Sequence, residues 1–105
     1  RSSMLSTKAE IPSLLEELSG IAHRSSVKIL EIRPEAGTGQ EEAFREIPIF
    51  IKARCGYHRL GHFISRLEAA ERIFEIKDIK IKGRPLTPRS HDVSLLVSTF
   101  LLSEN

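Results

Sequence analysis

Hydrophobic and polar residues alternate most regularly between Glu46 and Cys55. Every second position is apolar, which is the period of a β-strand with one buried face; these positions are Ile47, Ile49, Ile51, Ala53 and Cys55. After Gly56 the apolar period lengthens to about 3.6 residues, the period of a helix. One side of that helix collects Tyr57, Leu60, Phe63, Ile64, Leu67 and Ala70. Because glycine allows a sharp change of direction, we predict that strand and helix fold back and bury their apolar faces together.

The rest of the chain predicts one more helix and three more strands. An apolar stripe over residues 11–22 predicts a first helix with Pro12 in its first turn, where a missing N–H is no loss. The additional strands are predicted at residues 27–33, 73–82 and 92–102, and the last of them is apolar on both faces.

The order helix-strand-strand therefore occurs twice. It predicts an α+β fold of the ferredoxin-like plan in circular permutation, with a four-stranded antiparallel sheet and both helices on one face. The third strand carries alternating charges such as Asp78 and Lys80, which protect an exposed sheet edge, whereas the second and fourth are the most apolar. We therefore predict the order third, fourth, second, first. Pro48 cannot donate to a central ladder, so we expect a bulge or a strand start there.

Length and charge describe a single ordinary domain. The chain has 105 residues and a net charge of +2, too little to imply strong binding to nucleic acid or to an anionic membrane. We expect residues 1–10 to be a linker or residues left from cloning, and residues 11–103 to form the domain. The sequence has no apolar run near the roughly 18 residues of a membrane span. One cysteine excludes an internal disulfide.

Candidate chemistry is sparse. His58 and His62 lie four residues apart on the predicted helix, a spacing that can chelate a metal, with His91 or a loop carboxylate needed as a third ligand. Two solvated histidines are the commoner outcome, so no metal site is predicted. Cys55 falls on the buried strand face, where a thiol is a small hydrophobe. No serine has a nucleophile-elbow context and no glycine-rich phosphate loop occurs, so we predict neither an enzyme nor a cofactor.

The sheet face opposite the helices is more informative. It is predicted to carry an apolar patch of Phe50, Leu96, Phe100 and Leu102, and a patch that the monomer leaves uncovered usually marks a protein partner. Stacking of RNA on Phe50 and Phe100 is a weaker alternative, because the basic aromatic signature around them is missing. Lys82, Arg84 and Arg89 form a small basic cluster, for which a solvated turn is the default and an acidic partner the alternative.

Several short motifs resemble the periplasmic domain of the PilO family, inner-membrane assembly proteins of type IV pili. They cover nearly the whole chain, from residue 11 to residue 102. The motifs are Ile11-Pro12-Ser13-Leu14-Leu15, Glu46-Ile47-Pro48-Ile49, Gly56-Tyr57-His58-Arg59-Leu60-Gly61-His62-Phe63-Ile64, and Arg72-Ile73 with Ile76 and Asp78-Ile79. The related type II secretion M protein shares the plan and remains an alternative, as does a regulatory module that binds a small ligand or a metal.

The resemblance implies a periplasmic scaffold domain of an inner-membrane protein, anchored by a helix upstream of this chain. It implies homodimers or pairing with a PilN-like partner and, with a PilP-like lipoprotein, a link from the inner-membrane platform to the secretin. No catalysis, cofactor or nucleic acid comes with it. It implies that Gly56, Tyr57, Leu60 and Phe63, with Leu67 on the same stripe, determine the fold. Gly61 within the helix and the ending Phe100-Leu101-Leu102 depart from the family pattern.

Overall fold

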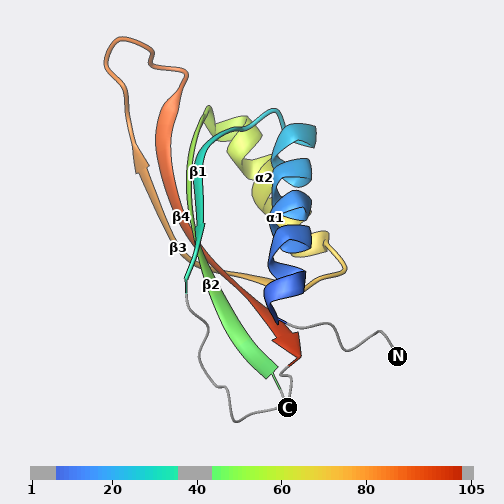
Figure 1. The fold of residues 1–105 in the computed structure, drawn as a ribbon. Coiled ribbons are helices and arrows are strands. Elements are labelled where there is room, and N and C mark those ends of the chain that lie inside the picture. Colours follow the sequence, from blue (N-terminus) through green and yellow to red (C-terminus); the bar gives the residue numbers. More distant parts are fainter. Residues whose placement is uncertain (1–6, 36–43, 103–105) are drawn as a thin grey trace.

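The computed structural model describes residues 7–35 and 44–102, which form two helices and four strands (Figure 1). The elements in chain order are α1 (Thr7–Arg24), β1 (Lys28–Pro34), β2 (Phe44–Cys55), α2 (Tyr57–Ala69), β3 (Phe74–Lys82) and β4 (His91–Leu102). Neither helix of the described segments combines the length and the apolar character that a membrane span needs.

The four strands form one antiparallel sheet in the order β1-β2-β4-β3, which confirms the predicted order. Both helices pack on the same face of the sheet, and the other face carries no helix in the described part (Figure 1). The predicted α+β plan is therefore confirmed. Strands β2 and β4 lie in the centre, and β3 with its charged side chains forms one edge.

The core lies between the helices and the inner face of the sheet. The alternating residues of β2 are all buried, with at most 6% of their surface exposed, which confirms the predicted period. Leu60, Phe63 and Leu67 of α2 are 5%, 0% and 0% exposed and cover this face. The core also includes Leu14, Leu18, Ile21 and Ala22 of α1, Val27, Phe74 of β3, and Val93, Leu95, Val97 and Leu101 of β4.

Pro12 lies in the second turn of α1, and its predicted place in the first turn is wrong, because the helix begins at Thr7. A proline there removes one N–H bond, the one that residue 12 would give to the carbonyl of residue 8. Pro12 is exposed, so water can solvate that carbonyl. The helix persists because its stripe around Leu14 and Leu18 is fully buried.

Pro48 lies inside β2 without a bulge, so the expectation of a bulge or strand start there is wrong. The register between β2 and β4 is continuous from Phe44 to Cys55. The Pro48 carbonyl accepts a hydrogen bond of 2.8 Å from the N–H of Glu35, on the side of β1. The nitrogen of a strand residue points to the same side as its carbonyl, and β1 ends at Pro34. The missing donor therefore costs nothing to the central ladder. The two register shifts lie in the edge strands β1 and β3.

Candidate functional site

The outer face of the sheet carries the apolar residues that the sequence assigned to an interface. Phe50 of β2 lies directly opposite Leu96 of β4, and Phe100 lies further along β4 opposite Glu46. Phe50, Leu96 and Phe100 are all half-buried. The side chain of Leu102 lies outside the described part of the chain. Phe50, Leu96 and Phe100 thus provide an apolar floor on β2 and β4, which we call the outer patch.

Charged side chains lie across the outer patch. The guanidinium carbon of Arg33 on β1 is 4.8 Å from the centre of the Phe50 ring, within the range of a cation–π contact. Lys77 of β3 reaches over β4, because its Nζ is 3.0 Å from Glu75 and 3.9 Å from Glu46 on β2. Ser98 of β4, the strand between Lys77 and Glu46, is only 2% exposed although it lies on the outer face. An apolar floor with a charged rim is the arrangement of many protein–protein interfaces.

The junction between β2 and α2 explains Gly56. Its φ of −82° and ψ of 171° are ordinary extended angles that any residue adopts. A Cβ at this position, however, would lie 2.7 Å from the carbonyl oxygen of Arg89. Glycine is therefore required by the close approach of the loop that precedes β4, and not by a special turn of the backbone as the sequence suggested.

Tyr57 lies at the margin of α2 and not on its buried face. It is 63% exposed, and its ring packs on His91, with the ring centres 4.2 Å apart. The buried face of α2 is centred on Leu60, Phe63 and Leu67. Tyr57 is rotated by about 60° from Leu60 at 100° per residue, so the sequence period placed it too close to the core.

The histidine pair of α2 is exposed and lacks a third partner. The Nε2 atoms of His58 and His62 are 3.2 Å apart, and the rings meet edge to face. Within residues 7–35 and 44–102, no group of three His, Cys, Asp or Glu side chains is arranged to hold a metal ion. His91 packs instead on Tyr57.

Cys55 lies at the end of β2 and is 6% exposed. Burial raises the pKa of its thiol above the ordinary value, and the positive charge of Arg59 opposes that effect only in part. The thiol form is therefore favoured, as expected for a packing residue and not for a nucleophile.

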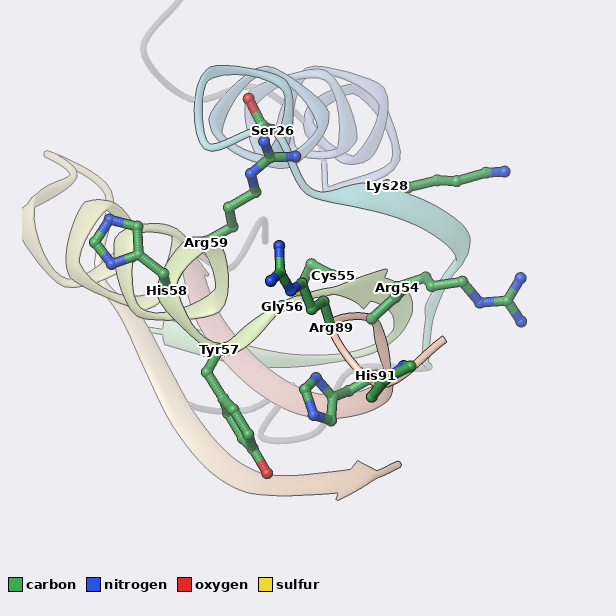
Figure 2. A pocket seen from close by; sticks show the side chains of 12 residues that line it. Ser26, Lys28, Arg54, Cys55, Gly56, Tyr57, His58, Arg59, Arg89 and His91 are labelled. Atoms are coloured by element: carbon green, nitrogen blue, oxygen red, sulfur yellow. The ribbon is translucent and has the colours of Figure 1, made fainter. Parts of the chain in front are cut away.

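The predicted basic cluster of loop residues divides between two surroundings. Arg54 donates a 2.9 Å hydrogen bond to Asp92 and thereby lowers the pKa of that carboxyl, to which the charges of Arg84 and Lys82 add. Arg89 lies elsewhere, in the wall of a pocket of about 730 Å³ at the junction of β2 and α2 (Figure 2).

Sequence reasoning missed this pocket. Its polar residues include Ser26 of the turn after α1, Arg59 of α2 and Arg89 of the loop before β4. No spacing along the chain connects these three segments, and only Arg89 stood in a noticeable basic cluster.

Comparison with known proteins identifies relatives over nearly the whole chain. A family model, the type IVa pilus alignment subcomplex PilO C-terminal domain, matches residues 10–104. The chain is 32% identical over 101 residues to the type IV pilus inner membrane component PilO of Pseudomonas aeruginosa. The match covers 91% of this chain and 46% of that protein, so the chain spans about half the length of this curated relative.

Solved structures show the same fold. The crystal structure of the type 4 fimbrial biogenesis protein PilO from Pseudomonas aeruginosa superposes with a TM-score of 0.81 at 29% identity, over 94% of this chain and 73% of that one. The core region of PilO from the same organism gives a TM-score of 0.72 at 26% identity, over 88% and 94% of the two chains. A core domain from Akkermansia muciniphila, at 10% identity and a TM-score of 0.73, covers 88% of this chain and 57% of that one and shows the fold alone.

The family match, the curated relative and the two Pseudomonas aeruginosa structures agree with the resemblance read from the sequence motifs. The family is a structural component of pilus assembly and not a family of enzymes. This chain therefore belongs to the PilO family of the type IV pilus alignment subcomplex, and it corresponds to the family's C-terminal domain.

Proposed function

We propose that this domain is a periplasmic interaction module of an inner-membrane protein. It pairs with a second copy or with a PilN-like partner and, together with a PilP-like lipoprotein, links the inner-membrane platform of the pilus machinery to the secretin. Family membership supports a role among pilus assembly proteins, and the relative from Pseudomonas aeruginosa is named an inner membrane component. The observation that carries the proposal is the outer patch, an apolar floor that the two helices leave on the opposite side of the sheet.

The physical basis of association is burial of this floor under a partner. Phe50, Leu96 and Phe100 are half-buried already, so each still has apolar area to remove from water, at about 25 cal/mol per Å². Arg33 and Lys77 lie at the rim, where charges set orientation and association rate more than affinity. A patch of this composition suits an interface of moderate size that exchanges partners.

Two identical substitutions in different surroundings test the proposal. Leu96→Glu places a carboxylate in the outer patch, whereas Leu86→Glu places it on a loop residue that is 96% exposed. We expect Leu96→Glu to weaken self-association in sedimentation equilibrium, or co-purification with co-expressed PilN-like and PilP-like partners, by at least about tenfold, because the charge must be buried at the interface. Leu86→Glu should leave both unchanged.

Circular dichroism of both variants shows whether the fold is kept. If folded Leu96→Glu associates as strongly as the original chain, the outer patch is not the interface.

The exposed pair of His58 and His62 is the observation that favours a second candidate, a metal-responsive module. Two imidazoles without a third ligand hold zinc weakly, so we expect no stoichiometric tight binding in a zinc titration. Tight binding that disappears in His58→Ala would establish the metal-binding role instead.

A further inference from the structure

A pocket of about 730 Å³ opens where β2 passes into α2, on the side of the helices and away from the outer patch. Four of the residues that line it are Lys or Arg, two are His, and no Asp or Glu is among them; the basic ones are Lys28, Arg54, Arg59, Arg89, His58 and His91. In Figure 2 the side chains of Arg59 and Arg89 extend into the pocket from two different segments, whereas Lys28 and Arg54 point away from it. We call this the cationic pocket.

Arg59 and Arg89 are exposed residues with no acidic partner in the part of the chain that the structure describes. Within residues 7–35 and 44–102 neither makes an ion pair or a side-chain hydrogen bond, whereas Arg54 is satisfied by Asp92 at 2.9 Å. Arg59 also lies close enough to the floor of the pocket to act electrostatically on Cys55. Two guanidinium groups that line one concave space favour an anion there, because each can form charge-assisted hydrogen bonds to it.

The walls of the pocket add further polar groups, and none of the side chains that line it is a carboxylate. Gly56 caps α2 with no side-chain hydrogen bond, and the first turn of the helix holds no acidic residue, so its backbone N–H groups keep their donor capacity. The Nδ1 atom of His91 is buried and has no partner in the described segments. The absence of a Cβ at Gly56 lets the backbone carbonyl of Arg89 approach this junction closely.

We propose that the cationic pocket binds a carboxylate on an acidic segment of a partner protein. Guanidinium groups pair with carboxylates through two parallel hydrogen bonds, and a Glu or Asp side chain on a peptide can enter a concavity. A lipid headgroup layer is favoured less, because membrane binding relies on clusters of four to eight basic residues, whereas only Arg59 and Arg89 extend into this pocket. This inference rests on the proposed interaction role and gives the domain a second surface.

Fluorescence anisotropy with a labelled hexaglutamate peptide tests the site, with a hexaserine peptide as the reference. The 105-residue chain should bind hexaglutamate and not hexaserine, and binding should weaken as salt is raised. The double variant Arg59→Gln/Arg89→Gln should raise the Kd about tenfold or more. Lys80→Gln/Lys82→Gln, which also removes two positive charges but from exposed positions of β3, should change it less than about twofold. Amide shifts on titration should centre on Gly56 to Arg59 and on Arg89.

Three results would overturn the inference. The first is an equal loss in Lys80→Gln/Lys82→Gln, which would show a response to net charge alone. The second is absence of hexaglutamate binding, and the third is binding of phosphatidylglycerol vesicles without binding of the peptide, which would assign the site to lipid. Leu96→Glu should still bind hexaglutamate. The two proposals can therefore fail separately: the outer patch is tested by association of Leu96→Glu, and the cationic pocket is tested by peptide binding of Arg59→Gln/Arg89→Gln.

Discussion

Gly56 lies at the N-terminal junction of α2, and Gly61 lies inside the helix. Substitution by alanine should lower the stability of the fold at Gly56 and raise it at Gly61. At Gly56 an added Cβ meets the carbonyl oxygen of Arg89 at 2.7 Å, whereas at Gly61 it meets no atom within 4 Å. Gly56 has φ and ψ that alanine adopts without strain. The cost of Gly56→Ala in the folded state is therefore steric and not conformational, and Gly61→Ala is its matched control.

The magnitudes follow from these contacts. To reach an ordinary contact of 3.4 Å from 2.7 Å, the Arg89 carbonyl must retreat by 0.7 Å. Its loop is held by hydrogen bonds of 3.0 Å from Thr87 to Arg84 and 2.9 Å from Ser90 to Thr87, so the movement strains a turn. Overpacking typically costs about 1–3 kcal/mol, and loss of unfolded-chain entropy returns about 0.4–1. We expect Gly56→Ala to lower stability by about 0.5–2 kcal/mol and Gly61→Ala to raise it by about 0.5–1 kcal/mol.

Urea unfolding followed by circular dichroism measures both changes. With an m-value of about 1–3 kcal/mol per M, a change of 1 kcal/mol moves the midpoint by roughly 0.3–1 M. The midpoint should fall for Gly56→Ala and rise for Gly61→Ala, with m unchanged. Equal stabilisation by both substitutions would refute the close contact at Gly56 and with it the placement of the loop before β4.

Two further predictions concern the core and the Arg54–Asp92 pair. Leu67→Ala should lower the free energy of unfolding by about 2–5 kcal/mol, since Leu67 is 0% exposed. Leu86 is 96% exposed, so Leu86→Ala should change that free energy by less than about 0.5 kcal/mol. Equal losses of stability for the two variants in thermal unfolding would contradict the packing of α2. Arg54 lowers the pKa of Asp92 below 3.8, so the pair contributes stability above that pH and loses it as the pH falls through the lowered pKa. In Arg54→Gln the carboxyl carbon of Asp92 should titrate in NMR spectra at a higher pH than in the original chain, and an unchanged midpoint would show that the pair does not form in solution.

The sequence alone determined the elements and their order in the sheet. Alternation from Ile47 to Cys55 marks β2, and the spacing of Leu60, Phe63 and Leu67 marks the buried face of α2; both patterns arise from local backbone geometry. The charges of β3 placed that strand at an edge, because an exposed edge needs protection from pairing. The boundaries agree with the prediction within a few residues at every element.

Only the tertiary structure decided features that depend on segments distant in the chain. The tolerance of Pro48 inside β2 depends on where β1 ends, and the need for glycine at residue 56 depends on the carbonyl of Arg89. Lys77 of β3 comes near Glu46 of β2 because both strands pair with β4, one on each side. Arg59 and Arg89 line one pocket because the loop before β4 packs beside the start of α2. Periodicity reports the environment of one element, whereas such contacts arise from the packing of several, and no local pattern encodes them.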